Sequence, residues 1–167
     1  MENISLFEKL NINMQTTFLM SLTDLIIDDI KCSQGYSSAI EAVKKCWDWI
    51  KYKSVCADDL YDYLENIEDT GVLTYLSLEK DPHREKVWIC IGNSLAYTIW
   101  AAYKYENQKH RPQTIECVDN ETIISFIETF KIVYDPQIVA LLLGYLSSSD
   151  SETEYEDIMQ FIKNNVQ

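Results

Sequence analysis

The residues with the clearest potential for chemistry are three carboxylates that lie within one helical turn of each other. Asp58, Asp59 and Asp62 have the DDxxD spacing with which enzymes acting on prenyl diphosphates hold Mg²⁺ against the diphosphate. Those enzymes need a second metal motif on a facing helix, and the sequence offers neither that motif nor basic diphosphate ligands nearby. We therefore interpret the motif as an exposed acidic helix surface and not as a catalytic site.

A second enzymatic interpretation uses some of the same carboxylates. All-helical nucleotide pyrophosphatases hold Mg²⁺ with ExxE and ExxD pairs on adjacent helices, and Asp62 and Glu65 fit the first pair. The partner pair would have to come from Asp24, Asp28 and Asp29, whose spacing does not fit the pattern. A Mg²⁺-dependent pyrophosphatase remains the enzymatic alternative.

No other residues form a recognisable catalytic or metal-binding pattern. The two histidines, His83 and His110, do not lie at metal-ligand spacing from a cysteine or from each other. The chain has no glycine-rich phosphate loop and no Ser-His-Asp or Cys-His arrangement that the sequence alone can assemble. We expect a protein that is not an enzyme, with no catalytic residue, no cofactor and no metal ion.

The composition limits the kinds of molecule that this protein is expected to bind. The chain has 167 residues, a net charge of -13 and 47% hydrophobic residues, which is typical of one globular domain spanning 1–167. A pI near 4.4 argues against nucleic acid and against an anionic membrane surface as partners. A protein partner is the remaining expectation.

Cysteine usage and apolar runs predict a cytoplasmic location. The five cysteines are odd in number and widely spaced, which favours free and mostly buried thiols in a reducing compartment. The first residues lack the apolar stretch of a signal peptide, and no apolar run is long enough to span a bilayer.

Apolar periodicity predicts an all-α fold, a single bundle of about six or seven helices. Asp81 and Pro82 form a helix-start signal for a long central helix near 83–107 that is apolar on nearly all sides. Ser151 and Glu154 predict a capping box for the last helix. The other predicted helices cover 14–31, 36–53, 57–68, 119–134 and about 136–146. Two segments are less regular: 72–78 is either a short helix or a connector, and 114–118 is a short extended piece.

The predicted helix at 57–68 carries a one-sided row of acids. Asp58, Asp62, Glu65 and Asp69 follow each other at i, i+4, i+7 and i+11, and no Lys or Arg occurs between Lys53 and Lys80. Like charges at this spacing repel one another by a few tenths of a kcal/mol per pair. A cationic partner would relieve that repulsion, so we predict a partner-binding surface here.

Two aromatic residues are candidate anchors for that surface. Trp49 lies off the apolar stripe formed by Ile40, Val43 and Trp47, and Tyr61 lies beside the acids. Aromatic residues are enriched at interface centres. The predicted site therefore consists of acids and aromatics: Asp58, Asp59, Asp62, Glu65, Asp69, Tyr61 and Trp49.

The sequence also resembles an all-helical immunity protein family of bacterial polymorphic toxin systems. The likeness covers about 15–135 and is carried by four segments: Cys46-Trp-Asp-Trp-Ile50, Ala57-Asp-Asp-Leu-Tyr-Asp-Tyr-Leu64, the helix around Ala96 to Glu106, and Pro112 to Val118. The resemblance implies a small cytoplasmic protein that binds and neutralises a cognate toxin domain, often a nuclease with a cationic cleft. It carries no catalytic residues to this chain. A non-catalytic acidic adaptor is the remaining alternative.

Overall fold

The computed structural model of the chain describes residues 2–149 and 154–166. Within these ranges the chain forms ten α-helices and one 3₁₀-helix, without a strand. The predicted all-α class is confirmed, although the helices are more numerous than the predicted six or seven. In chain order they are α1 (Glu2–Lys9), α2 (Ile12–Ile26), η1 (Ile27–Ile30), α3 (Tyr36–Tyr52), α4 (Ala57–Leu64), α5 (Val72–Leu78), α6 (Pro82–Tyr105), α7 (Gln113–Glu116), α8 (Asn120–Val133), α9 (Gln137–Ser148) and α10 (Tyr155–Asn165).

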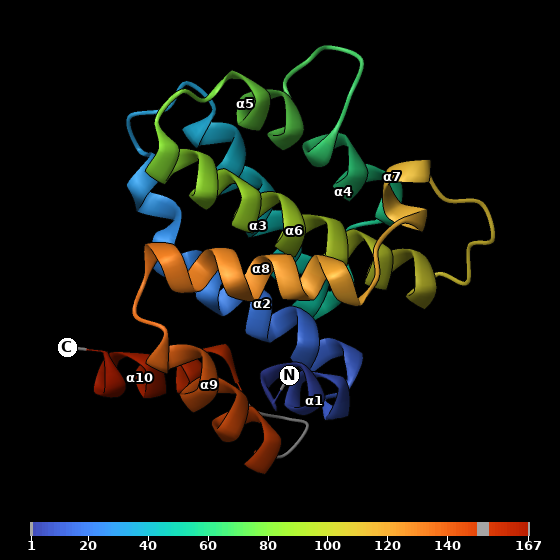
Figure 1. Cartoon of the computed structure of the whole chain (residues 1–167). Coiled ribbons are helices and arrows are strands. Elements are labelled where there is room, and N and C mark those ends of the chain that lie inside the picture. Colours follow the sequence, from blue (N-terminus) through green and yellow to red (C-terminus); the bar gives the residue numbers. More distant parts are fainter. Residues whose placement is uncertain (1, 150–153, 167) are drawn as a thin grey trace.

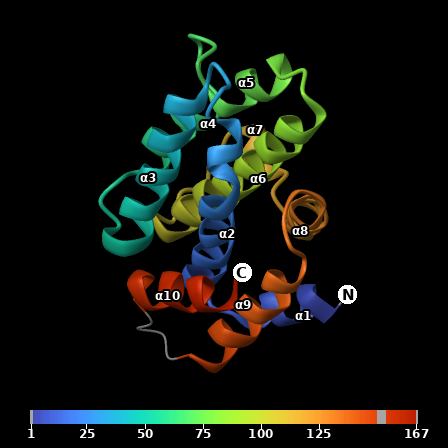
Figure 2. The same ribbon diagram turned by 90° about the vertical axis from the view of Figure 1, so that its left-hand side faces the viewer.

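The long apolar helix α6 occupies the centre, as predicted. It begins where Asp81 accepts hydrogen bonds from the backbone N–H groups of His83 (3.0 Å) and Arg84 (2.9 Å), with Pro82 at the first helical position. It packs against α2, α3, α4, α5, α7 and α8. Figure 2 shows α3 and α8 on opposite sides of α2 and α6, so the core forms around this central pair.

The two ends of the molecule are built differently. Helices α1, α9 and α10 gather at the bottom of Figure 1, and α4 and α5 lie at the top. The loop that joins α4 to α5 projects beyond the helices at the top. The candidate acidic surface therefore lies far from the end at which α1, α9 and α10 pack.

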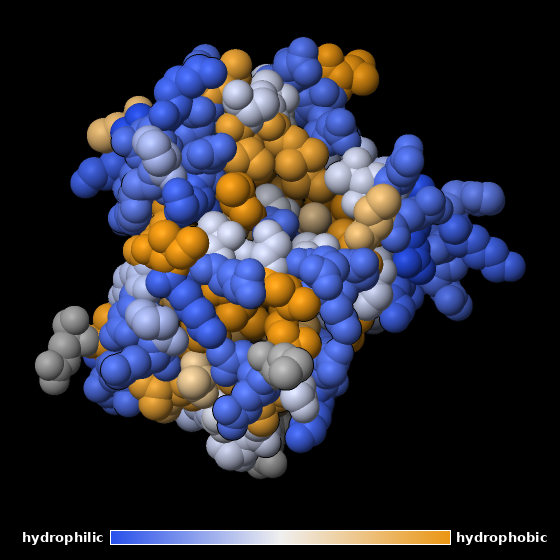
Figure 3. Space-filling model, viewed as in Figure 1, coloured by the Kyte–Doolittle hydropathy of each residue, from blue (hydrophilic) through white to orange (hydrophobic). Residues whose placement is uncertain are grey.

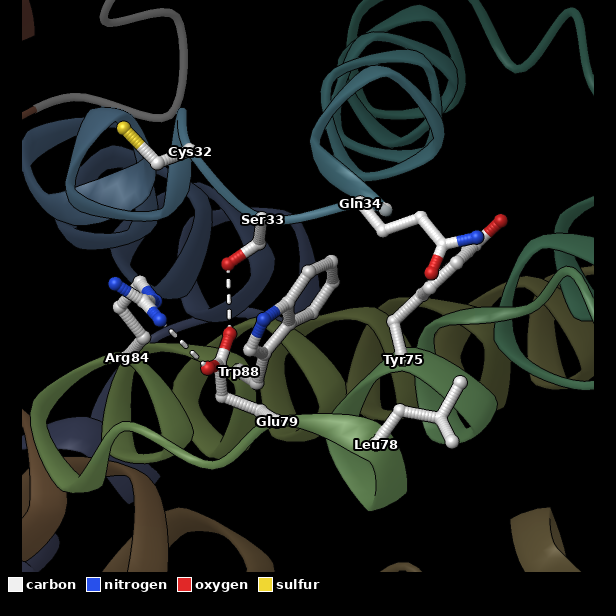
Figure 4. A pocket seen from close by; sticks show the side chains of 9 residues that line it. Cys32, Ser33, Gln34, Tyr75, Leu78, Glu79, Arg84 and Trp88 are labelled. Carbon is white, nitrogen blue, oxygen red and sulfur yellow. Dashed lines mark hydrogen bonds and ion pairs between the residues drawn. The ribbon is translucent and has the colours of Figure 1, made fainter.

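A polar junction fixes α5 against the turn that precedes α3. The Glu79 carboxylate accepts hydrogen bonds from the Ser33 hydroxyl (2.7 Å) and from Nη2 of Arg84 (3.1 Å), as Figure 4 shows. These bonds, first that from Arg84, lower the pKa of Glu79 to about 2, so the residue stays ionised near neutral pH. The junction holds the C-terminal end of α5 in place.

Aromatic packing completes that junction. The Tyr75 ring stacks on Trp88 with centroids 5.9 Å apart, and it lies directly over Gly35. A Cβ atom at Gly35 would be only 2.2 Å from the Tyr75 ring, so only glycine allows this approach. The N-terminal end of α3 and the helix α5 are thus held in direct contact.

Several local predictions are decided by the structure. The segment Val72–Leu78 is a helix, and the segment predicted as extended at 114–118 instead contains the helical turn α7. The Ser151 half of the predicted capping box lies outside the described residues, while Glu154 is the N-cap of α10. The five cysteines are free as predicted, but only Cys46 and Cys90 are buried.

Helix α1 has no counterpart among the predicted elements, because its eight residues are fewer than the window over which apolar periodicity indicates a helix. No helix in the described ranges combines the length and apolarity needed to cross a membrane.

Candidate protein-binding surface

The acidic surface begins at the N-terminus of α4, which the end of α6 caps. The Glu106 carboxylate accepts a hydrogen bond of 2.7 Å from the backbone N–H of Ala57. Asp58 and Asp59 occupy the first turn of α4, where the helix macrodipole favours negative charge. The dipole thus offsets part of the like-charge repulsion that the sequence indicates.

Helix α4 ends at Leu64, four residues earlier than predicted. Glu65 already has an extended backbone, with φ of -151° and ψ of 131°. The Asn66 side chain replaces the next helical turn: its Oδ1 atom accepts from the backbone N–H groups of Glu68 and Thr70, both at 3.1 Å. Such local side-chain bonds compete with helix formation.

The predicted row of four acids on one helix face is therefore wrong beyond Asp62. Asp69 lies in the loop after α4, with a left-handed backbone at φ of 54°. Asp58, Asp59 and Asp62 remain on the helix, and Glu65 follows at its end. The carboxylates still cluster at one end of the fold, but on a helix and a loop instead of on a single helix.

Two of the acids are fixed by tyrosine hydroxyls. Tyr103 of α6 donates a hydrogen bond of 2.5 Å to Asp58, and Tyr61 donates one of 2.7 Å to Glu65. The Thr114 hydroxyl of α7 donates a second bond to Glu65 at 3.2 Å. Because these donors carry no positive charge, they orient the carboxylates without neutralising them.

This arrangement raises the pKa of both tyrosine hydroxyls. Burial, followed by the hydrogen bond to Asp58, raises the pKa of Tyr103. Burial also raises the pKa of Tyr61, and its bond to Glu65 adds to the effect. Both hydroxyls thus remain protonated donors near neutral pH.

Asp59 and Asp62 are exposed like Asp58 and Glu65, but neither accepts a hydrogen bond from a tyrosine or threonine hydroxyl in the described part of the chain. Both line a shallow hollow of about 280 Å³ together with Lys45, Val55 and Tyr63. Lys45 comes from α3, so a basic residue adjoins these acids in space although none adjoins them in sequence. The Tyr63 hydroxyl bonds to Glu41 of α3 at 3.1 Å, which brings another acid to the same area.

The prediction that Trp49 lies at the surface is wrong. Its side chain is only 1% exposed, and its ring packs edge-on against Tyr105 with centroids 6.3 Å apart. Helix α3 contacts α2, α4 and α6, so the stripe it buries is broader than the predicted one and is rotated from it. The residues it buries are Ala39, Ala42, Val43, Cys46, Trp49 and Ile50, whereas Ile40 is 39% exposed.

The carboxylates proposed as a second metal-binding pair are engaged elsewhere. Asp24 accepts hydrogen bonds from Trp47 Nε1 (3.0 Å) and from the Tyr155 hydroxyl (3.2 Å), and its burial raises its pKa to about 6. Asp28 accepts from the Tyr36 hydroxyl at 2.7 Å, and Asp29 pairs with His83 at 2.8 Å. Among the residues that the structure describes, no group of three or more His, Cys, Asp or Glu side chains could hold a metal ion.

The sequence did not indicate the residues of other helices that contact α4 and orient its acids. Tyr103, Glu106 and Thr114 are 45 to 56 positions from Asp58 in the chain, and no local pattern connects them to it. A sequence signal existed only for the turn after α4, since Asn66 and Gly71 are residue types typical of turns.

By fold class, this is an all-α protein with an acidic surface at one end. The family model of immunity protein Imm6 matches residues 14–133, which is most of the chain, and the chain therefore belongs to this family of immunity proteins. Comparison with curated proteins and with solved structures gave no match.

Family membership confirms the immunity-protein resemblance seen in the sequence. It indicates a role in immunity to a toxin protein. The matched range contains α4 and the loop after it, whereas α1, α9 and α10 lie outside it.

Proposed function

We propose that this chain neutralises a cognate toxin domain in the cytoplasm by binding it through the α4 surface, which we define as Asp58, Asp59, Tyr61, Asp62, Glu65 and Asp69. The partner face of the toxin is cationic, as in a nuclease whose cleft holds a phosphate backbone. Trp49 takes no part because it is buried.

The observation that carries this proposal is the fixed geometry of the acids. Asp58 and Glu65 are held by hydroxyl donors from α6, from α4 itself and from the α7 region, at 2.5 to 3.2 Å. Carboxylates that are oriented before binding lose little conformational freedom when the partner arrives. The exposed Asp59 and Asp62 add negative charge, which raises the rate of encounter with a cationic partner.

The proposal explains why the acids of the α4 surface are kept although they repel one another. Only two ion pairs form within the described residues, His83 with Asp29 and Arg84 with Glu79, and neither involves the α4 surface. Basic groups of the toxin would supply the missing counter-charges. The surface would then be more stable in the complex than in the free protein.

Co-expression with the toxin domain encoded beside this gene tests the function. Cells that produce the toxin domain alone should stop growing, and cells that also produce this chain should survive, with both proteins recovered as one complex. A toxin domain from an unrelated system, which this chain should not neutralise, is the control. Recovery of a complex without survival would instead favour the adaptor alternative, and absence of both would contradict the proposal.

A further inference from the structure

The loop between α4 and α5 exposes an apolar side chain almost completely. Ile67 is 98% exposed, whereas the next most exposed large hydrophobic residue in the described part of the chain, Tyr52, is 71% exposed. The sequence pattern predicts the opposite, because Ile67 continues the buried positions Leu60 and Leu64. The early end of α4 turns this residue outward.

The loop that presents Ile67 is held by an internal hydrogen-bond network. In addition to its two bonds to backbone N–H groups, the Asn66 side chain donates to the Asp62 carbonyl at 2.8 Å and contacts the Thr70 hydroxyl at 3.0 Å. Gly71 closes the loop against α4, since a Cβ atom there would be 2.5 Å from the Leu64 carbonyl oxygen. The exposed position of Ile67 is thus a built feature of the loop.

Single exposed hydrophobic residues are common on protein surfaces and usually need no explanation. Ile67 differs because charge surrounds it: Glu65, Glu68 and Asp69 are all exposed, and no basic residue occurs in the chain between Lys53 and Lys80. An apolar centre with a charged rim is the arrangement found at specific protein interfaces.

A second apolar area lies on the helices of the same end of the molecule. Figure 3 shows hydrophobic atoms gathered over α5 and α6, above α8. The half-exposed apolar residues of these two helices include Leu73, Leu76, Ile89 and Ala96.

We propose that Ile67 is the apolar anchor of the toxin interface and enters a nonpolar depression on the toxin whose rim is basic. This inference rests on the proposed function and adds the residue that keeps the complex together. The acids of the α4 surface accelerate encounter, and burial of Ile67 slows dissociation. A second copy of this chain is a poor occupant, because its own acidic loop would bring like charges together.

The test measures association and dissociation rates of the inactivated toxin domain for wild type, Ile67→Ala and Ile132→Ala. Ile132 is a matched control, because it is the same residue type, is 68% exposed and lies on α8. We expect Ile67→Ala to raise the dissociation rate about tenfold or more with little change in the association rate, and Ile132→Ala to leave both unchanged. Thermal unfolding should be the same for all three proteins, because neither side chain is buried.

The possible failures of the inference and of the function are distinct. If wild type binds and Ile67→Ala dissociates at the wild-type rate, Ile67 is not the anchor and the proposed function stands. If wild type does not bind the toxin domain, both are wrong. If light scattering shows a wild-type dimer that Ile67→Ala dissociates, the occupant is a second copy and the inference is overturned.

Discussion

Reversing the two free acids of the α4 surface, Asp59→Lys with Asp62→Lys, is expected to slow association with the toxin domain by about tenfold to a hundredfold at low salt. These two acids are exposed and neither is held by a tyrosine or threonine hydroxyl, so the substitutions leave the oriented Asp58 and Glu65 in place. The measurement is the association rate as a function of ionic strength. The variant should also depend less on salt than wild type, because less charge steers the encounter.

A charge-matched control separates steering by this surface from steering by net charge. Glu85→Lys with Glu128→Lys makes the same change in net charge at exposed positions on α6 and α8. At an ionic strength of about 0.15 M we expect this control to associate within about threefold of wild type, because exposed charges farther from the interface than the Debye length of about 8 Å are screened. Equal slowing by both double variants would show that net charge, and not the α4 surface, governs encounter.

Replacement of Trp49 by alanine is expected to lower the free energy of unfolding by about 3 to 5 kcal/mol, as for other large aromatic residues removed from cores. Its ring is buried between α3 and the end of α6, with the Lys53 ammonium 4.1 Å from the ring centroid. Urea denaturation measures the loss. The folded fraction of the variant should bind the toxin domain with wild-type rates.

Tyr52→Ala is the matched control for Trp49, since it removes an aromatic side chain from the same helix at a position that is 71% exposed. We expect its free energy of unfolding to stay within about 0.5 kcal/mol of wild type. If Trp49→Ala left stability unchanged and accelerated dissociation of the toxin, Trp49 would belong to the interface and its burial would be contradicted.

The sequence was most informative where a signal is local and strong. Asp81 and Pro82 mark the start of α6 to the residue, and the apolar character of that helix on most sides placed it correctly at the centre. Such a signal depends only on neighbouring residues and on the period of the helix. The acids Asp58, Asp59 and Asp62 were likewise placed correctly on the exposed side of one short helix.

The errors have two physical causes. Helical periodicity fixes one apolar stripe, but α3 packs against three other helices, so its buried side extends to Trp49, which the stripe left out. At the end of α4, the Asn66 side chain outcompetes a further helical turn, which moves Ile67 and Asp69 into a loop. The bonds of Tyr103 and Glu106 to α4 depend on tertiary packing, and a single sequence contains no signal for them.

The structure divides the proposed binding task between two parts of one surface. Oriented and free acids of α4 supply charge, and the loop after α4 supplies an apolar contact. The acid variants should therefore change mainly the association rate, and the Ile67 variant should change mainly the dissociation rate. A surface that served only to keep the protein soluble would show neither effect.

Hydrogen exchange of this chain, alone and with the inactivated toxin domain, tests the central claim most directly. The account predicts that the complex slows exchange of backbone amides across residues 57–71, which comprise α4 and the loop that follows it. Exchange at the opposite end, in α1, α9 and α10, should not change. Slower exchange confined to those three helices, with residues 57–71 unaffected, would contradict the account.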